Sequence, residues 1–184
     1  THTQSEFGAE YDSLSDMVSF GVAPSLVVYE WALKGLGKWG WFAAFIYCAA
    51  TALRLARFNT NIDVVDKRYF QGLPSPAAAA LIAGFVWVMH DYNFSGESVR
   101  WYACALTIFA GLSMVSNLPF YSFKDFNVRK SVPFMVIFLA ALFFIVISSY
   151  PPGVLFGLFL SYALSGYVLW LWRRSRKDAH KPIA

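Results

Sequence analysis

Six apolar segments, each about as long as a membrane is thick, constrain this chain more than any other feature. A hydrocarbon core of about 30 Å is crossed by roughly 20 helical residues, and inside lipid a helix satisfies all of its own backbone hydrogen bonds. The pattern therefore predicts an all-α, polytopic transmembrane helix bundle with six spans and short loops. The spans are Met17–Leu33, Trp39–Phe58, Pro76–Tyr92, Val99–Leu118, Val132–Tyr150 and Val154–Trp172.

Composition excludes a water-soluble protein of this size. Of the 184 residues, 58% are apolar or aromatic and only 14% are charged, whereas soluble domains carry about 25% charged residues. A chain of this length has too little interior to bury so much apolar surface. We expect one transmembrane domain over residues 1–172 and a basic cytoplasmic tail over residues 173–184.

The basic residues predict how the bundle is oriented. If the spans alternate across the membrane, only Lys34, Lys38 and Arg100 fall on the side opposite the N-terminus, which leaves twelve of the fifteen Lys and Arg residues on the N-terminal side. By the positive-inside rule the N-terminal side is the cytoplasm. The net charge of +4 then reflects topology and attraction to anionic membrane lipids, and it does not indicate binding to nucleic acid.

Two acidic residues lie just before the first span. If this segment is helical, Gly8, Asp12 and Asp16 are spaced i, i+4, i+8 and form one stripe, which Ser19 and Ala23 continue. We expect this stripe to face the bundle interior. Two carboxylates one turn apart repel each other, and Mg²⁺ is a natural partner because it also keeps positions open for phosphate. Gly8 leaves room for a bulky group. The alternative is a pair of solvated acids that complement the start of a helix dipole.

Two arginines close the second span on the same predicted side of the membrane. Arg54 and Arg57 are spaced i, i+3 and share a helix face, and guanidinium groups bind phosphates and carboxylates in a bidentate fork. The alternative is snorkelling of both side chains to the membrane interface.

Prolines predict two local features. Pro24 lies within the first span and frees a backbone carbonyl one turn earlier. The run Pro74-Ser75-Pro76 predicts a rigid turn that starts the third span, with Pro76 suited to a first helical turn.

Four sequence blocks, taken together, carry a resemblance to a known family. Gly8-x3-Asp12-x3-Asp16 is similar to the second half of the CDP-alcohol phosphotransferase signature, D-x2-D-G-x2-A-R-x8-9-G-x3-D-x3-D. The wider match resembles the bacterial integral-membrane phosphatidylserine synthases of that family. Its blocks are FGAEYDSLSDMVSFGVAPS at 7–25, RLARFN at 54–59, GLPSPAAA at 72–79 and YSFKD at 121–125.

The first half of the signature is absent from the chain. Its spacing would place it just before Thr1. The resemblance therefore implies an N-terminally truncated form of an eight-helix protein, which lacks two transmembrane helices and half of its metal site. We expect such a fragment to be inactive by itself.

The resemblance implies a reaction and roles for the acidic stripe. A phosphatidyl group would pass from CDP-diacylglycerol to the hydroxyl of L-serine, with a divalent cation (Mg²⁺ or Mn²⁺) as cofactor. Asp12 would bind the metal and the nucleotide, and Asp16 would act as general base and as a further metal ligand. Gly8 would let the cytidine nucleotide lie against the helix.

The resemblance also implies substrate ligands, a location and alternatives. The active site would face the cytoplasm at a bacterial inner membrane, and whether the chain forms a homodimer is left open. The same chemistry on choline, inositol or glycerol 3-phosphate is one alternative. A small transporter is another, although it predicts ionisable residues near mid-bilayer. The side chains expected to hold serine's carboxylate or the phosphates are Arg54, Arg57, Asn59 and Lys124.

Overall fold

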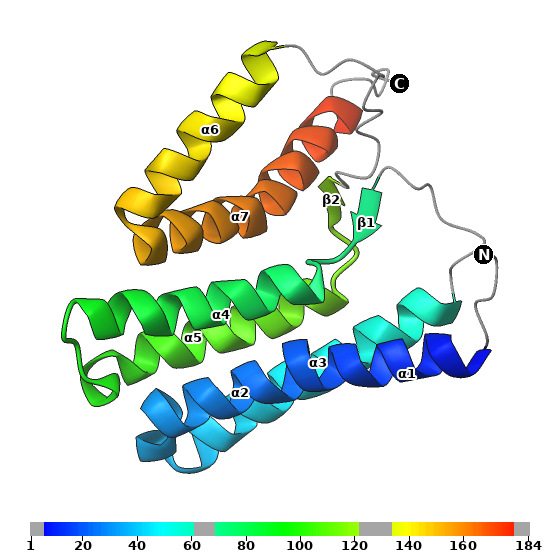
Figure 1. The fold of residues 1–184 in the computed structure, drawn as a ribbon. Coiled ribbons are helices and arrows are strands. Elements are labelled where there is room, and N and C mark those ends of the chain that lie inside the picture. The colour runs from blue at the N-terminus through cyan, green and yellow to red at the C-terminus, as the bar shows by residue number, and fades with distance from the viewer. Residues whose placement is uncertain (1–5, 61–68, 122–133, 179–184) are drawn as a thin grey trace.

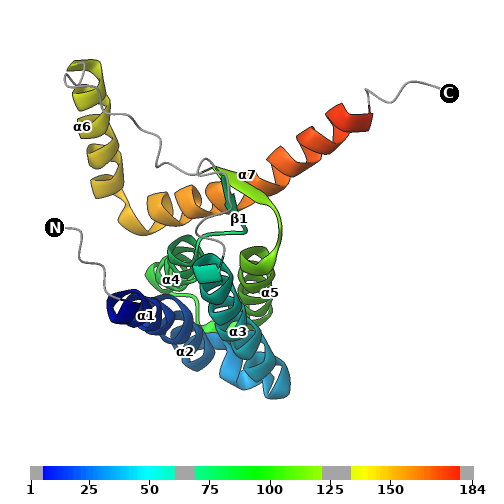
Figure 2. The same ribbon diagram turned by 90° about the vertical axis from the view of Figure 1, so that its right-hand side faces the viewer.

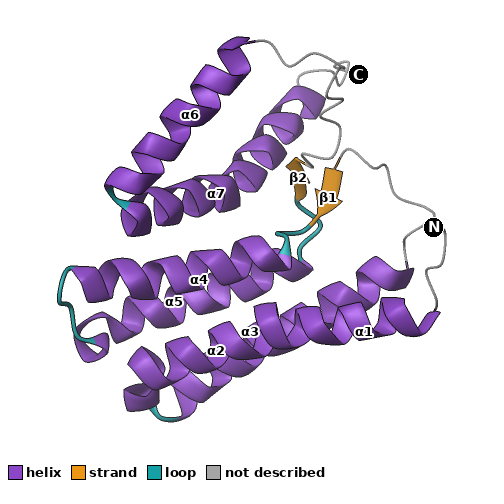
Figure 3. Ribbon diagram, in the orientation of Figure 1, coloured by secondary structure: helices purple, strands orange, loops and turns teal. Residues whose placement is uncertain are grey.

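The computed structural model describes residues 6–60, 69–121 and 134–178, and helices make up most of these ranges (Figures 1 and 3). The first helical stretch is continuous and consists of α1 (Glu6–Asp16), a π-helical segment (Met17–Val22), α2 (Ala23–Val28), a second π-helical segment (Tyr29–Leu33) and a short 3₁₀ turn (Lys34–Leu36). The helices that follow are α3 (Lys38–Thr60), α4 (Ser75–Asp91), α5 (Gly96–Val115), α6 (Phe134–Ser149) and α7 (Pro151–Asp178).

The predicted helical class is confirmed, and the chain is an integral membrane protein. Each of the six predicted spans overlaps one of these helical stretches. Three helices in the described ranges are long and apolar enough to cross a membrane, namely Lys38–Thr60, Gly96–Val115 and Pro151–Trp172. A total of six membrane crossings remains a prediction.

The centre of the bundle is formed by α3 and α5, with the first helical stretch and α4 packed beside them (Figures 1 and 2). The buried residues of α3 include Gly40, Ala43, Tyr47 and Ala50, which recur every three or four positions and form one face of the helix. Gly111 of α5 lies against the backbone of Tyr47, where a Cβ atom would come within 3.2 Å of the Tyr47 Cα. Small residues at such contacts let membrane helices approach closely.

A single hydrogen bond compensates for the proline in the first helical stretch. Pro24 has no N–H to offer the carbonyl of Phe20, four residues earlier. The hydroxyl of Tyr47 donates to that carbonyl at 2.8 Å, and Tyr47 is fully buried. This hydrogen bond joins the first helical stretch to α3 at the carbonyl one turn before Pro24.

The π-helical segment changes which face of the first helical stretch is buried. In a π turn the hydrogen bond runs from i to i+5, so the extra residue rotates the following side chains about the helix axis. Gly21 and Pro24 are buried there, whereas Ser19 and Ala23 are exposed. The prediction that Ser19 and Ala23 continue the Asp16 stripe toward the bundle interior is therefore wrong.

Two short strands, which the sequence did not predict, pair at one end of the bundle (Figure 3). β1 (Tyr69–Gln71) and β2 (Pro119–Tyr121) are antiparallel, with Gln71 opposite Pro119. The next residue, Gly72, donates its N–H to the carbonyl of Leu118 at 2.9 Å. The connection into α4 is thereby fastened to the connection that leaves α5.

Gly72 allows a first prediction about stability. Its φ is +82°, and a Cβ atom at this position would lie 2.2 Å from the carbonyl oxygen of Met114. Backbone strain and overpacking cost about 1–3 kcal/mol each, so Gly72→Ala should lower the free energy of unfolding by about 2–5 kcal/mol. Thermal unfolding in detergent measures this loss.

The matched control is Gly157→Ala on α7, because Gly157 is exposed and has no atom within 4 Å of the added Cβ. This variant should unfold at or slightly above the temperature of the unchanged protein, since alanine favours helix more than glycine. Equal unfolding temperatures for the two variants would contradict a special role for Gly72.

Candidate active site

The side chains predicted to carry the chemistry come from elements that meet at one end of the bundle. The start of α1, the end of α3, both strands and the start of α4 all lie at that end, and α7 crosses α4 close by (Figure 1). The chain therefore brings residues from four separate segments to one region.

The acidic stripe lies on α1, which is α-helical from Glu6 to Asp16. Gly8, Asp12 and Asp16 consequently share one face. Gly8 and Asp12 are exposed, and Asp16 is half-buried. Neither carboxylate forms a hydrogen bond or an ion pair with any residue of the described ranges, so both keep their oxygens available.

The donor chemistry of this stripe suits a hard divalent cation. Mg²⁺ is usually held by one or two carboxylates together with phosphate oxygens of the substrate, and Asp12 with Asp16 supplies two carboxylates. Within the described residues, no group of three or more His, Cys, Asp or Glu side chains gathers into a metal site. The two residues thus fit a cation that the substrate itself helps to bind.

Arg54 of α3 is bound to the start of α4. Its Nη1 donates to the hydroxyl of Ser75 at 3.0 Å, and Ser75 is only 1% exposed at the start of α4. The Nε of Arg54 is buried and has no hydrogen-bond partner among the described residues. Asp16 and Tyr162 both lie near the guanidinium. Arg54 is therefore fixed in place but keeps a donor to offer.

Arg57 is already engaged with protein acceptors. Its Nη1 donates to the carbonyl of Val115 at 3.3 Å, and its Nη2 donates to Asn117 Oδ1 at 2.5 Å and to Gln71 Oε1. These acceptors lie on β1, on the last residue of α5 and on the segment that joins α5 to β2. The Arg57 side chain thus links the end of α3 by hydrogen bonds to β1 and to the chain between α5 and β2.

Asn59 and Lys124 complete the predicted set. The Nδ2 of Asn59 donates to the Ser13 hydroxyl at 2.9 Å, which ties the last turn of α3 to α1 next to Asp12. Lys124 lies outside the described residues. The structure therefore brings Asp16, Arg54 and the Asn59 contact together around α1 and α3.

Several residues of this region were not singled out from the sequence. Ser75 belongs to the Pro74-Ser75-Pro76 run, which the sequence marked only as a turn, and Gln71 was not predicted to have a role. Asn117 and Tyr162 gave no signal, because their positions near the two arginines depend on how α5 packs against α3 and how α7 packs against α4. In the sequence, only the Pro-Ser-Pro run indicated local structure in this region, namely the turn that places Ser75 at the start of α4.

Comparison with known proteins identifies the family. The model of the CDP-alcohol phosphatidyltransferase family matches residues 1–109. The chain belongs to this family. This CDP-alcohol phosphatidyltransferase is 34% identical over 174 residues to the CDP-diacylglycerol–serine O-phosphatidyltransferase of Helicobacter pylori, which covers 94% of the chain and 71% of that relative. The protein of the same name from Methanocaldococcus jannaschii is 38% identical over 125 residues, covering 68% of the chain and 55% of that relative.

The family assignment fixes the class of reaction. A CDP-alcohol phosphatidyltransferase is a transferase of phospholipid biosynthesis, and its substrates are a CDP-linked lipid and an alcohol. Enzymes of this family generally use divalent cations. The Asp12 and Asp16 carboxylates of α1 and the buried Nε donor of Arg54 are suited to such a charged substrate.

Proposed function

We propose that this enzyme transfers the phosphatidyl group of CDP-diacylglycerol to L-serine, giving phosphatidylserine and CMP. The observation that carries the choice of serine is the Arg54 side chain, which lies near Asp16 and whose buried Nε has no partner among the described residues. Serine presents a hydroxyl to be deprotonated and a carboxylate to be held, so it needs a base beside a cation. Choline and inositol carry no carboxylate. The names of the relatives from H. pylori and M. jannaschii support the same choice.

The reaction follows from the roles of these two side chains. Asp16 accepts the proton of the serine hydroxyl as general base, and the serine oxygen bonds to the phosphorus that bears the diacylglycerol. The bond between that phosphorus and the bridging oxygen breaks, and CMP leaves. Arg54 holds the serine carboxylate through a charge-assisted hydrogen bond. A bound divalent cation supplies neutralisation of phosphate charge, and Asp12 and Asp16 would hold it.

The remaining predicted residues take supporting places in this proposal. Gly8 and Asp12 would lie beside the cytidine nucleotide, since both are exposed on the same face of α1. Asn59 would keep that face next to the end of α3. Arg57 and Lys124 stay proposed substrate ligands. The guanidinium of Arg57 already donates to three protein acceptors, which favours a structural role for this residue.

We further propose that the full-length protein crosses the bacterial inner membrane with this site on the cytoplasmic side. The predicted twelve-to-three division of basic residues supports this orientation. A site at the membrane boundary lets the lipid chains stay in the bilayer while cytidine and serine remain in water.

Turnover of labelled serine tests the proposal. Full-length protein in lipid vesicles, supplied with CDP-diacylglycerol, radiolabelled serine and Mg²⁺ or Mn²⁺, should form phosphatidylserine and CMP in equal amounts, and a chelator should stop the reaction. Choline, inositol and glycerol 3-phosphate should each give a kcat/KM at least about 100-fold lower, because a site built around a carboxylate and a hydroxyl rejects other groups. Faster transfer to any of these three alcohols would overturn the choice of serine and leave the family reaction intact.

A further inference from the structure

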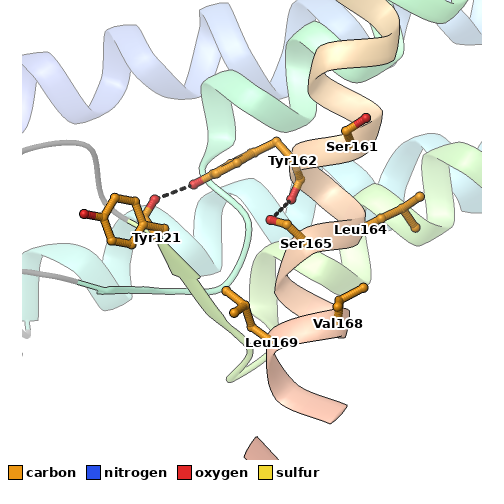
Figure 4. A pocket seen from close by; sticks show the side chains of 7 residues that line it. All are labelled: Tyr121, Ser161, Tyr162, Leu164, Ser165, Val168 and Leu169. Carbon is orange, nitrogen blue, oxygen red and sulfur yellow. Dashed lines mark hydrogen bonds between the residues drawn. The ribbon is translucent and has the colours of Figure 1, made fainter. Parts of the chain in front are cut away.

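An open cleft runs along α7 beside β2 (Figure 4). Its volume of about 650 Å³ falls within the range of about 300–1,000 Å³ found for small-molecule sites. One lining residue comes from β2 and the others come from successive turns of α7. They are Tyr121, Ser161, Tyr162, Leu164, Ser165, Val168 and Leu169.

The cleft is polar at its Tyr162 end and apolar beyond it. The Tyr162 hydroxyl donates to the carbonyl of Tyr121 at 3.1 Å, and the Ser165 hydroxyl donates to the carbonyl of Tyr162 at 2.7 Å (Figure 4). These hydroxyl groups are thus bonded to backbone. The rest of the cleft presents the apolar side chains of Leu164, Val168 and Leu169 to a ligand.

Tyr162 also connects the cleft to the site described above. The Tyr162 side chain lies near the Arg54 guanidinium, and Asp16 lies near the same guanidinium. An acid, a cation and an apolar cleft therefore follow one another across the molecule. This order matches a lipid whose charged head group is bound near Arg54 and whose hydrocarbon extends past Tyr162.

The wall of the cleft is held firmly by contacts on the other side of α7. The ring of Phe120 packs onto Gly166, where a Cβ atom would lie 2.4 Å from the Phe120 Cζ. The same part of α7 is also hydrogen-bonded to α5, because the Tyr167 hydroxyl lies 2.7 Å from the Ser113 hydroxyl. The cleft thus keeps its position relative to β2 and α5.

We propose that this cleft holds one acyl chain of CDP-diacylglycerol while the phosphatidyl group is transferred. The inference rests on the proposed reaction for its lipid substrate and assigns a role to α7, which lies beyond the residues that the family model matches. Bilayer hydrocarbon is as apolar as leucine, so the cleft adds little affinity for the chain. Its effect is to align the lipid with the pyrophosphate next to Asp16 and Arg54.

Photocrosslinking tests the assignment. The probe is CDP-diacylglycerol with a diazirine on one acyl chain, added to the full-length protein in phosphatidylcholine vesicles. After irradiation, peptide mass spectrometry should find the label on Leu164, Val168 or Leu169. Excess unlabelled CDP-diacylglycerol should reduce that label at least about tenfold, whereas the same amount of added phosphatidylcholine should not. Label that CDP-diacylglycerol does not displace would show bulk lipid only and overturn the proposal.

Two tryptophan variants make the test specific. Val168→Trp fills the cleft, and it should remove the displaceable label and raise the KM for CDP-diacylglycerol at least about fivefold, with the KM for serine unchanged. Leu171→Trp adds the same ring to an exposed position of α7 outside the cleft and should behave like the unchanged protein. Equal effects of both variants would overturn the assignment.

Two further controls keep the outcome decisive. Leu164→Trp replaces Val168→Trp if that variant does not reach the membrane in folded form. Labelling requires only binding of CDP-diacylglycerol, so a failure of serine to act as acceptor would leave the labelling result intact. The failure of this inference and the failure of the proposed function are therefore distinguishable.

Discussion

Asp16→Asn is expected to lower kcat by about 10²–10⁴-fold, the usual contribution of a general base, while CDP-diacylglycerol still binds. Asparagine has nearly the size of aspartate, but its amide cannot accept the proton of the serine hydroxyl. The half-buried position of Asp16 beside Arg54 leaves no other carboxylate of the described residues next to that cation. Single-turnover assays give the chemical rate, and displacement of labelled CDP-diacylglycerol gives the binding constant.

Glu10→Gln is the matched control for this substitution. Glu10 is an exposed acid on the same helix, but it lies off the face that Gly8, Asp12 and Asp16 share. The rate should stay within about twofold of the unchanged enzyme, since only one exposed surface charge is removed. Undiminished turnover of Asp16→Asn would eliminate Asp16 as the base. Loss of CDP-diacylglycerol binding together with turnover would also count against that role.

Arg54→Gln should raise the KM for serine by roughly 10–100-fold and change the KM for CDP-diacylglycerol much less. A hydrogen bond to a charged group contributes about 1.5–3 kcal/mol, and about 1.4 kcal/mol corresponds to a tenfold change in affinity. The sharper readout is ethanolamine, which keeps the hydroxyl and the amine of serine but lacks its carboxylate. The preference for serine over ethanolamine should collapse in the variant, because the group that senses the carboxylate is gone.

Arg57→Gln provides the contrasting result. Its guanidinium serves acceptors on β1 and on the segment after α5, so its removal should lower the unfolding temperature by roughly 2–8 °C. The KM for serine should change by less than about threefold. If both arginine variants raise the serine KM equally, the separation of their roles is wrong and Arg57 is a substrate ligand as well.

The sequence predicted the helices well because their signal is local. Long apolar segments require helices in lipid, and Pro24 was enough to predict the free carbonyl that Tyr47 occupies. The π-helical segment could not be predicted, since the apolar pattern does not determine whether a hydrogen bond spans four or five residues. This is why Ser19 and Ala23 were placed on the wrong face. Three-residue strands are likewise too short to have a periodic signal.

The candidate site was predictable only in part for a related reason. Asp12 and Asp16 share a face through helix geometry alone, and that part followed from their spacing. Arg54 and Arg57 were treated as an equivalent pair for the same reason, because they are three residues apart. The structure distinguishes them through Ser75, Gln71 and the end of α5, which are distant in sequence. Tyr162 depends on the packing of the last helix and has no local signature at all.

The hydrogen bond from Tyr47 to the Phe20 carbonyl also fixes the relative height of the two side chains that we propose as base and cation. Phe20 lies about one helical turn below Asp16, and Tyr47 lies about two turns below Arg54. Because Pro24 leaves this carbonyl without its usual N–H donor, sliding of one helix past the other would leave the Tyr47 hydroxyl without this acceptor. The relative height of the proposed base, Asp16, and of the Arg54 guanidinium along the bundle is thereby set by the one N–H that a proline lacks.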